Sequence, residues 1–315
     1  MNYRSFCLFL VLLLLTTGTA IAQESTESPE PSPQLEIMPF EGLDRTYALY
    51  IPSTYDENEP SGLLLLLHGS GGQGYPMIAS TNLAAQAEQT GYILVAPDGI
   101  DGYWRYLDIY AEEDGVDDMA FLVALIDHLS EQYNVDQNRL YVFGFSNGGV
   151  MALRMRCDLA DKLAGVVSLG ATPTFGLSQV CLDADPFPTM IVLGTADEAM
   201  PWQGDAEVVD GVMYSSFSMS QTVGYLNSLN GCDPTPSYMG AISTEDSAIE
   251  VYLTDFEDCS GNPGNVYVAL VDYNHNWPFG VRVATAGGNV GDFADILWTF
   301  FAANPRADDG NQEDE

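Results

Sequence analysis

A run of five leucines, residues 63–67, is the feature that most constrains the fold of this chain. A continuous apolar run of strand length, without polar residues at alternate positions, is typical of a strand buried on both faces. Strands of that kind belong to parallel sheets, whose two faces are covered by helices. The run continues into His68-Gly69-Ser70-Gly71-Gly72, which predicts a glycine-rich loop directly after the strand.

Apolar runs and helical periodicity alternate along the rest of the chain. Further strands are expected at residues 45–52, 92–96, 140–143, 164–169, 189–193, 249–253 and 266–271. Helices are expected at residues 82–90, 116–133, 220–229 and 292–302, and a further helix follows the segment 144–149 and runs through Arg156. The alternation predicts one α/β domain over residues 37–304, with a doubly wound, mostly parallel sheet in a three-layer sandwich.

The two ends of the chain differ from this pattern. Arg4, an apolar stretch and then Ala20-Ile21-Ala22 are typical of a cleavable signal peptide over residues 1–22. The apolar stretch is short for a membrane span and no stop-transfer pattern follows, which makes a retained anchor the weaker alternative. We therefore expect a secreted protein, extracellular or periplasmic, without a membrane partner. Residues 23–36 and the acidic residues 305–315 are predicted to be disordered.

Four of the five cysteines lie beyond the predicted signal peptide. In an exported protein an even number of cysteines indicates disulfides. Three pairings are possible, and we favour Cys157 with Cys181 and Cys232 with Cys259 because each pair closes a modest loop. Each bridge would stabilise the fold by about 3 kcal/mol.

The formal net charge is -36, from 45 Asp plus Glu against nine Lys plus Arg. This charge makes nucleic acid an improbable partner and repels polyanionic substrates. The acidic runs lack the spacing of a calcium loop, so that we expect a solvated acidic surface and no metal. Lys162 is the only lysine. Such depletion of lysine leads to the hypothesis that the protein works in salty surroundings.

Gly144-Phe145-Ser146-Asn147-Gly148 lies between a predicted strand and a predicted helix. This G-x-S-x-G pattern, in that context, predicts a nucleophile elbow, the strained turn that exposes a serine in the α/β-hydrolase fold. Glycines two positions either side of the serine let neighbouring backbones approach. The alternative is an ordinary glycine-rich turn between a strand and a helix.

A serine hydroxyl needs a neighbouring imidazole to take its proton, and the chain has three histidines. His275 follows the last predicted strand and is the expected base. His68 begins the glycine-rich loop, and His128 lies within a predicted helix. The acid should lie between serine and histidine in the chain, and Asp197, after the strand at 189–193, fits that order. The competing acids are Asp183, Asp185, Asp205 and Glu198.

Acyl transfer also needs donors for the oxyanion, each contributing about 3 kcal/mol. We expect the backbone N–H of Asn147 as the first donor and that of Ser70 or Gly71 as the second. The glycine-rich loop lacks the lysine of a phosphate-binding loop, and no cofactor is expected. Aromatic side chains near the same edge would suit a sugar or phenolic ring, although packing is the alternative. These candidates are Tyr103, Trp104, Trp202 and Trp277.

With these residues in place, the sequence resembles the secreted polyhydroxybutyrate depolymerase and feruloyl esterase family, carbohydrate esterase family one. The matching segments are Arg45-Thr46-Tyr47, Leu67-His68-Gly69, Ala96-Pro97-Asp98-Gly99, Val116-Asp117-Asp118, Gly144-Phe145-Ser146-Asn147-Gly148-Gly149, Gly194-Thr195-Ala196-Asp197 with Pro201-Trp202, Asn230-Gly231-Cys232 and His275-Asn276-Trp277-Pro278. The chain departs from the family pattern at Leu193, where many relatives have histidine, and at Val271-Asp272-Tyr273, where they have glycines.

The resemblance implies a cofactor-free serine carboxylesterase acting through an acyl-enzyme. Its expected substrates are feruloyl or acetyl esters of plant polysaccharide, with polyhydroxyalkanoates or their oligomers as the alternative. The granule-binding domain typical of extracellular polyester depolymerases is not expected here, which favours soluble or polysaccharide-borne esters. Further alternatives are an acyltransferase or peptidase with the same triad, or a non-catalytic binding protein on this scaffold.

Overall fold

The computed structural model describes residues 32–108, 115–182, 184–209, 212–260, 264–284 and 289–306. Contacts divide the chain into two units, Met1–Glu30 and Pro31–Glu315, and every described residue belongs to the second. The predicted signal peptide and the tail beyond Arg306 lie outside the described residues. None of the described helices is long and apolar enough to cross a membrane.

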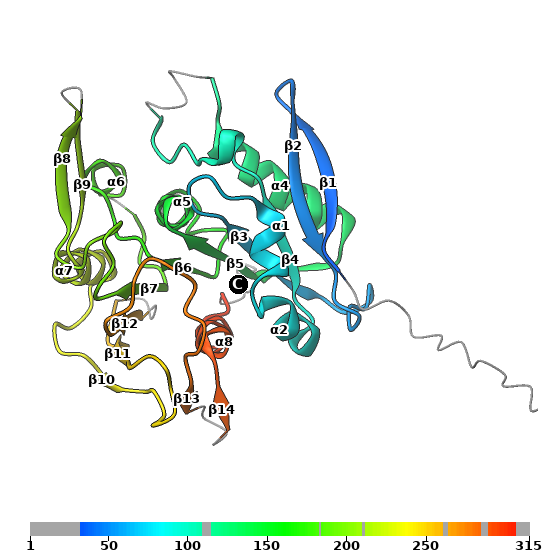
Figure 1. The fold of residues 1–315 in the computed structure, drawn as a ribbon. Coiled ribbons are helices and arrows are strands. Elements are labelled where there is room, and N and C mark those ends of the chain that lie inside the picture. Colours follow the sequence, from blue (N-terminus) through cyan, green and yellow to red (C-terminus); the bar gives the residue numbers. More distant parts are fainter. Residues whose placement is uncertain are drawn as a thin grey trace, which may run out of the picture. The chain divides into compact units, whose positions relative to one another are not determined.

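The described strands form a ten-stranded sheet that the parallel strands dominate (Figure 1). In spatial order the strands are β1 (Gln34–Phe40), β2 (Leu43–Tyr50), β4 (Ile93–Pro97), β3 (Ser61–Leu67), β5 (Val135–Phe145), β6 (Gly165–Leu169), β7 (Thr189–Gly194), β12 (Asn265–Leu270), β11 (Val251–Phe256) and β10 (Tyr238–Ala241). Pairing is parallel from β4 through β12 and antiparallel at both ends of the sheet. The prediction of a doubly wound, mostly parallel sheet is confirmed.

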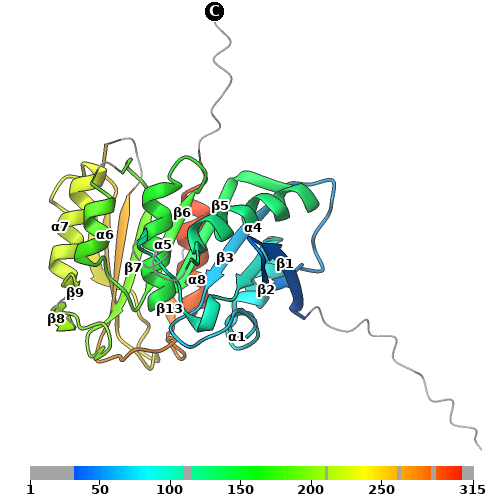
Figure 2. The same cartoon turned by 90° about the horizontal axis from the view of Figure 1, so that it is seen from above.

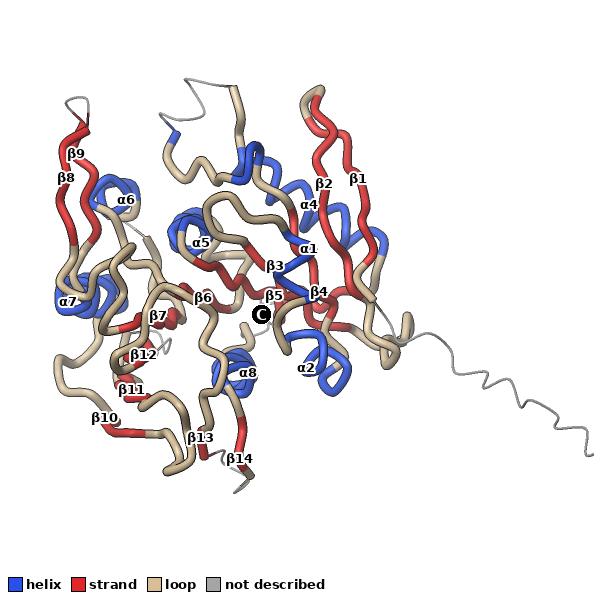
Figure 3. The backbone as a smooth tube through the Cα atoms, in the orientation of Figure 1, coloured by secondary structure: helices blue, strands red, loops and turns tan. Residues whose placement is uncertain are grey.

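Helices lie on both sides of the sheet (Figures 2 and 3). They are α1 (Gly74–Ala79), α2 (Leu83–Thr90), α4 (Asp118–Gln132), α5 (Asn147–Asp158), α6 (Phe175–Val180), α7 (Met219–Asn230) and α8 (Phe293–Ala303), with a 3-10 turn, η1, at Ile100–Gly102. The apolar side chains of α2 and α8 pack on one face, and those of α4 and α5 on the other. Two small hairpins complete the described chain: β8 (Asp205–Val209) with β9 (Val212–Ser216), and β13 (Val283–Ala284) with β14 (Val290–Gly291).

The five leucines of β3 show how this three-layer arrangement follows from the sequence. Because successive side chains of a strand point to opposite faces, Leu64 and Leu66 join the core beneath α2 and α8. Leu63, Leu65 and Leu67 join the core beneath α4 and α5. All five are at most 2% exposed, which confirms a strand buried on both faces.

One predicted boundary was wrong: residues 34–36, expected in a disordered linker, belong to β1. This edge strand pairs with β2 along its whole length, through a tight turn in which Glu41 and Gly42 have φ of 49° and 83°. Leu35 and Ile37 stay 66% and 64% exposed. Backbone pairing therefore holds residues 34–37, whereas Met38 and Phe40 also pack, partly buried, on the core beneath α4. Pairing by itself leaves no hydrophobic pattern in residues 34–36. The predicted disordered tail, residues 305–315, likewise begins later than expected. Arg306 still belongs to the fold, because its backbone N–H donates to the Asn138 carbonyl.

Both favoured disulfides are present. Cys157–Cys181 joins the end of α5 to the end of α6, and Cys232–Cys259 joins the chain after α7 to the loop after β11. The first bridge ties two helices together and the second ties the end of a helix to a loop, and α5, β11 and their neighbours belong to the half of the molecule that carries β6, β7 and β12.

Candidate active site

Ser146 stands between β5 and α5 with φ 55° and ψ −121°, a conformation that only glycine adopts easily. The surrounding glycines allow close backbone contacts. A Cβ on Gly144 would lie 2.0 Å from the Gly148 carbonyl oxygen, and one on Gly148 would lie 2.3 Å from the Leu67 carbonyl oxygen. The Ser146 N–H donates to the Leu169 carbonyl at the end of β6. The turn is therefore the strained elbow that its sequence predicts.

The structure brings Ser146, His275 and Asp197 together. The Ser146 hydroxyl donates to His275 Nε2 over 2.8 Å, and His275 Nδ1–H donates to Asp197 Oδ2 over 2.7 Å. The three residues follow β5, β12 and β7, so that each lies beyond the carboxyl end of a parallel strand. This is the edge at which α/β proteins gather their reactive groups.

Asp197 is held in place before it meets the histidine. Its Oδ1 accepts the N–H groups of Ala199 and Met200, over 2.9 and 2.8 Å, and the residue is 5% exposed. Oδ2 is left for His275 Nδ1–H, which fixes the tautomer that presents an unprotonated Nε2 to Ser146. The loop that carries Asp197 is tied to the loop that carries His275, because the Ala196 N–H donates to the Tyr273 carbonyl.

The other two histidines have different environments. His68 is buried, Nε2 accepts the Gly99 N–H over 2.9 Å, and Nδ1–H donates to the Gly69 carbonyl over 2.8 Å. Burial lowers the pKa of His68, which keeps the ring neutral and committed to the loops around it. His128 lies on α4, where Gln132 donates to its ring. Neither makes a bond to Ser146 among the described contacts.

Within the described residues, two of the three predicted oxyanion donors have a backbone N–H group that is not bonded to a backbone carbonyl. Asn147 is the first residue of α5, and a first-turn N–H has no acceptor within its own helix. A Cβ on Gly69 would lie 3.2 Å from Ser146 Cβ, which places the loop at residues 68–72 against the serine. The expectation for Gly71 was wrong, because its N–H donates to the Gly102 carbonyl over 2.8 Å. Within the described ranges the Ser70 N–H has no such acceptor.

Comparison with known proteins finds esterases among the relatives of this chain. The model of the phospholipase/carboxylesterase family matches residues 54–178, which include Ser146. Feruloyl esterase C of Emericella nidulans is 29% identical over 266 residues, 82% of this chain and 84% of that protein. Probable feruloyl esterase C of Aspergillus niger is 26% identical over 93% of this chain and 96% of that protein. The solved acetyl xylan esterase from Aspergillus awamori has a TM-score of 0.58, 13% identity and coverage of 85% and 99%.

The chain has the α/β-hydrolase fold and is a carboxylic ester hydrolase. A second solved structure, a feruloyl esterase module from Clostridium thermocellum complexed with sinapinate, has the same fold, with a TM-score of 0.53 and 14% identity over 79% of this chain and 84% of that one.

The structure corrects one aromatic candidate of this hydrolase. Trp104 is 2% exposed, and its indole Nε1–H donates to the His68 carbonyl over 3.0 Å, so that its ring faces the interior rather than a ligand. Trp277 is half-buried with its ring against Phe143 and Phe293. Trp202 is also half-buried and packs beside α7. Position in a loop could not reveal this, because the covering side chains come from distant segments.

A buried ion pair behind the site was not anticipated, although both of its residues lie in segments that resemble the family. Arg45 Nη2 donates to Asp118 Oδ1 over 2.7 Å, and the guanidinium lies 3.7 Å from the centre of the Phe121 ring. Burial lowers the pKa of Arg45, and the charge of Asp118 opposes that effect. Asp118 Oδ2 accepts the Arg105 N–H over 2.8 Å. The pair therefore anchors the loop that precedes α4.

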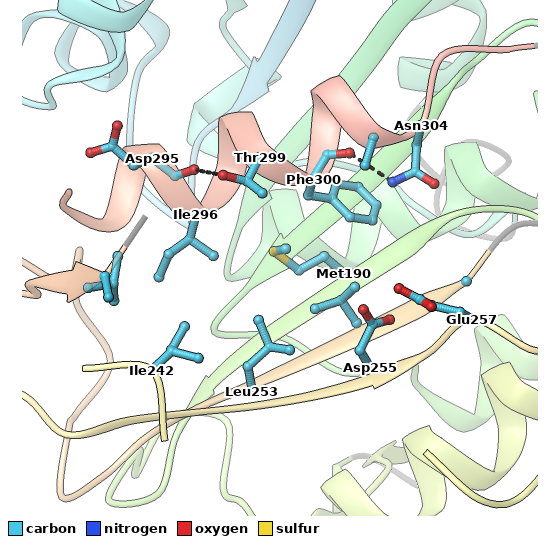
Figure 4. A pocket seen from close by; sticks show the side chains of 15 residues that line it. Met190, Ile242, Leu253, Asp255, Glu257, Asp295, Ile296, Thr299, Phe300 and Asn304 are labelled. Atoms are coloured by element: carbon cyan, nitrogen blue, oxygen red, sulfur yellow. Dashed lines mark hydrogen bonds between the residues drawn. The ribbon is translucent and has the colours of Figure 1, made fainter. Parts of the chain in front are cut away.

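A cavity of about 460 Å³ between α8 and the strands β11 and β12 lies apart from the triad of this esterase (Figure 4). Met190, at the start of β7, lines it, whereas Asp197 follows the end of that strand. Leu253, Ile296 and Phe300 form apolar walls, with the Asp255 carboxylate at one end. Within the described ranges, no three His, Cys, Asp or Glu side chains gather as metal ligands.

Proposed function

We propose that this esterase is a secreted serine carboxylesterase that cleaves feruloyl or acetyl esters of plant polysaccharide through an acyl-enzyme. Ser146 is the nucleophile, His275 the general base and Asp197 the acid that orients the histidine. One observation carries the proposal: an uninterrupted hydrogen-bond chain runs from the Ser146 hydroxyl through His275 to a carboxylate that two backbone N–H groups already hold. That chain supplies what nucleophilic catalysis by serine requires.

The reaction follows from this geometry. Ser146 Oγ attacks the ester carbonyl while its proton passes to His275 Nε2, and the resulting imidazolium is stabilised by Asp197. The negative charge on the former carbonyl oxygen is met by the N–H groups of Asn147 and Ser70. His275 then protonates the departing alcohol, leaving an acyl-Ser146. Water, losing its proton to His275, attacks the acyl group, and the acid leaves as Ser146 recovers its proton.

The choice of acyl group rests on the relatives and on the surface near the site. The names of the relatives are those of feruloyl and acetyl xylan esterases. Tyr103 follows η1 and Phe175 begins α6, both beyond carboxyl ends of parallel strands, and they are 51% and 54% exposed. Exposed aromatic rings suit stacking with a phenolic acyl group or a sugar. Secretion is supported by the two disulfides, which persist in oxidising compartments.

The test measures the acid released from methyl ferulate, acetylated xylan and hydroxybutyrate oligomers. Ser146→Ala and His275→Gln should each lower kcat by at least about 10³-fold, since either change removes a member of the triad. His128→Gln is the matched control, and it should keep full activity. A Ser146→Ala protein that retains a tenth of the activity would refute the mechanism. Release from hydroxybutyrate oligomers alone would refute the proposed substrate class.

A further inference from the structure

Two loops meet beside Ser146, and we name them by their residues: the glycine loop, residues 68–72, and the brace loop, residues 99–105. Three hydrogen bonds join them. The Gly71 N–H donates to the Gly102 carbonyl, the Gly99 N–H donates to His68 Nε2, and Trp104 Nε1–H donates to the His68 carbonyl, over 2.8, 2.9 and 3.0 Å. The brace loop thus binds the glycine loop through the backbone of Gly71 and through both the ring and the carbonyl of His68.

The brace loop also binds the residue after the nucleophile. Asn147 Oδ1 accepts the Trp104 N–H over 2.7 Å, and Asn147 Nδ2–H donates to the Trp104 carbonyl over 3.2 Å. The side-chain amide therefore pairs with both backbone groups of Trp104, a contact that we call the clamp. Because the clamp uses only the side chain of Asn147, its backbone N–H is left to face the substrate.

Trp104 is the point at which these contacts converge. Its peptide groups hold Asn147, its indole holds the His68 carbonyl, and its ring packs on the His68 ring with centroids 5.0 Å apart. At 2% exposure the indole N–H is shielded from water, which would otherwise compete for the His68 carbonyl. One buried residue therefore touches the segments that carry both open oxyanion donors, Asn147 and, two residues after His68, Ser70.

We propose that Trp104 is a positioning residue that fixes the spacing between the two oxyanion donors, with the Asn147 side chain as its counterpart. Oxyanion donors lower the barrier most when they are correctly placed before the reaction starts. Donors that must move during the step cost reorganisation energy, which reduces the stabilisation of the transition state. Trp104 makes no contact with substrate in this role. The inference rests on the proposed function, because only acyl transfer through Ser146 uses these donors.

The far end of the brace loop has an anchor of its own. The Arg105 N–H donates to Asp118 Oδ2, and Asp118 Oδ1 is held by the buried Arg45. A rigid attachment on the residue next to Trp104 allows the loop to fix the donors rather than move with them. This assigns a purpose to the buried ion pair: it connects the start of β2 and of α4 to the oxyanion site without touching the reacting atoms.

The experiment compares two tryptophan variants that each lose one indole hydrogen bond. Trp104→Phe removes the bond to the His68 carbonyl and keeps an aromatic ring on His68. Trp298→Phe is the matched control, because Trp298 is also buried and its Nε1–H donates over 2.9 Å to Thr90 Oγ1, on α2. We expect Trp104→Phe to lower kcat about 10-fold with KM within 2-fold, whereas Trp298→Phe leaves both unchanged.

A second readout separates positioning from loss of fold. A trifluoromethyl ketone forms a tetrahedral adduct with Ser146, and this adduct needs the oxyanion donors. In Trp104→Phe its inhibition constant should therefore rise by the same factor by which kcat/KM falls. Circular dichroism and melting curves establish the folded fraction of each variant. If Trp104→Phe loses no more kcat than Trp298→Phe, or changes KM alone, the positioning role is wrong.

Asn147→Ala completes the test from the other side of the clamp. This variant keeps the backbone donor and removes both bonds to Trp104, and it should also lower kcat about 10-fold. In the double variant with Trp104→Phe the two losses should not multiply. Each change breaks one of the two links through which Trp104 connects the donors, and either break by itself releases their spacing. Full multiplication would overturn the inference. A normal Trp104→Phe beside an inactive Ser146→Ala would reject the inference while the proposed function stands.

Discussion

At the scale of single residues, the backbone strain at Ser146 separates what the protein needs for activity from what it needs for stability. A serine at φ 55° and ψ −121° raises the energy of the folded chain by about 1–3 kcal/mol. The rest of the elbow holds this conformation through the Ser146 N–H bond to Leu169 and the packed glycines at 144 and 148. The hydroxyl is thereby projected toward His275 rather than into the helix.

Replacing Ser146 by glycine should therefore stabilise the protein while abolishing activity. We expect the free energy of unfolding to rise by about 1 kcal/mol, because relief of strain exceeds the conformational entropy that glycine loses on folding. Ser146→Ala is the control, since it removes the same hydroxyl and keeps the strained backbone. Denaturant titrations of both variants give the comparison. Equal stability of the glycine and alanine variants would show that relief of strain does not exceed the conformational entropy that glycine loses on folding.

At the scale of elements, β11 carries a carboxylate on a face that is otherwise apolar. Asp255 lies at one end of the cavity under α8, with Leu253 on the same face of the strand (Figure 4). Burial raises the pKa of Asp255, and the negative charge of Glu257 raises it further. The folded state therefore disfavours the ionised form of Asp255. Below the ordinary aspartate pKa of about 3.9 the protonated side chain contributes fully to the stability of the fold. This contribution is lost as the pH rises through the raised pKa of the folded state.

The variant Asp255→Asn should accordingly melt a few degrees higher than the wild type at pH 7, with the difference vanishing near pH 3.5. Asp258→Asn, at an exposed position after the same strand, removes an equal charge and serves as the control. Melting temperatures across this pH range measure both. A gain of the same size in Asp258→Asn would assign the effect to net charge instead of burial.

At the scale of the whole molecule, charge is the dominant property. With 45 acidic and nine Lys plus Arg residues in the chain, most surface carboxylates lack a cation to pair with. Their mutual repulsion destabilises the compact state in dilute buffer, and it is screened as the Debye length falls from about 10 Å at 0.1 M to about 3 Å at 1 M salt.

We therefore expect the melting temperature to rise by about 5 °C between 0.05 and 1 M sodium chloride, with esterase activity maintained. Sucrose at equal osmolality is the control, because it does not screen charge. Activity that falls steadily toward molar salt would contradict the hypothesis of a protein suited to saline surroundings.

The sequence alone determined the features that depend on residues close together in the chain, namely the buried strands and the nucleophile elbow. Runs such as residues 63–67 identify buried strands because burial on both faces requires an apolar side chain at every position. The glycines around Ser146 identify the elbow because steric demands act between near neighbours. The fold class follows from such local signals. So does the order of Ser146, Asp197 and His275, which the nucleophile elbow predicts. Loop length, by contrast, only favoured one of the three possible disulfide pairings.

Only the tertiary structure decided which groups are already occupied. It excluded the Gly71 N–H through a bond to Gly102 and turned Trp104 from a ligand platform into a buried support for His68 and Asn147. It also placed β1 in the sheet through pairing with β2. In each case the partner is determined by where other segments of the folded chain come to lie. Hydrogen bonds between separate segments impose no spacing on the sequence, and for that reason no periodic pattern could reveal them.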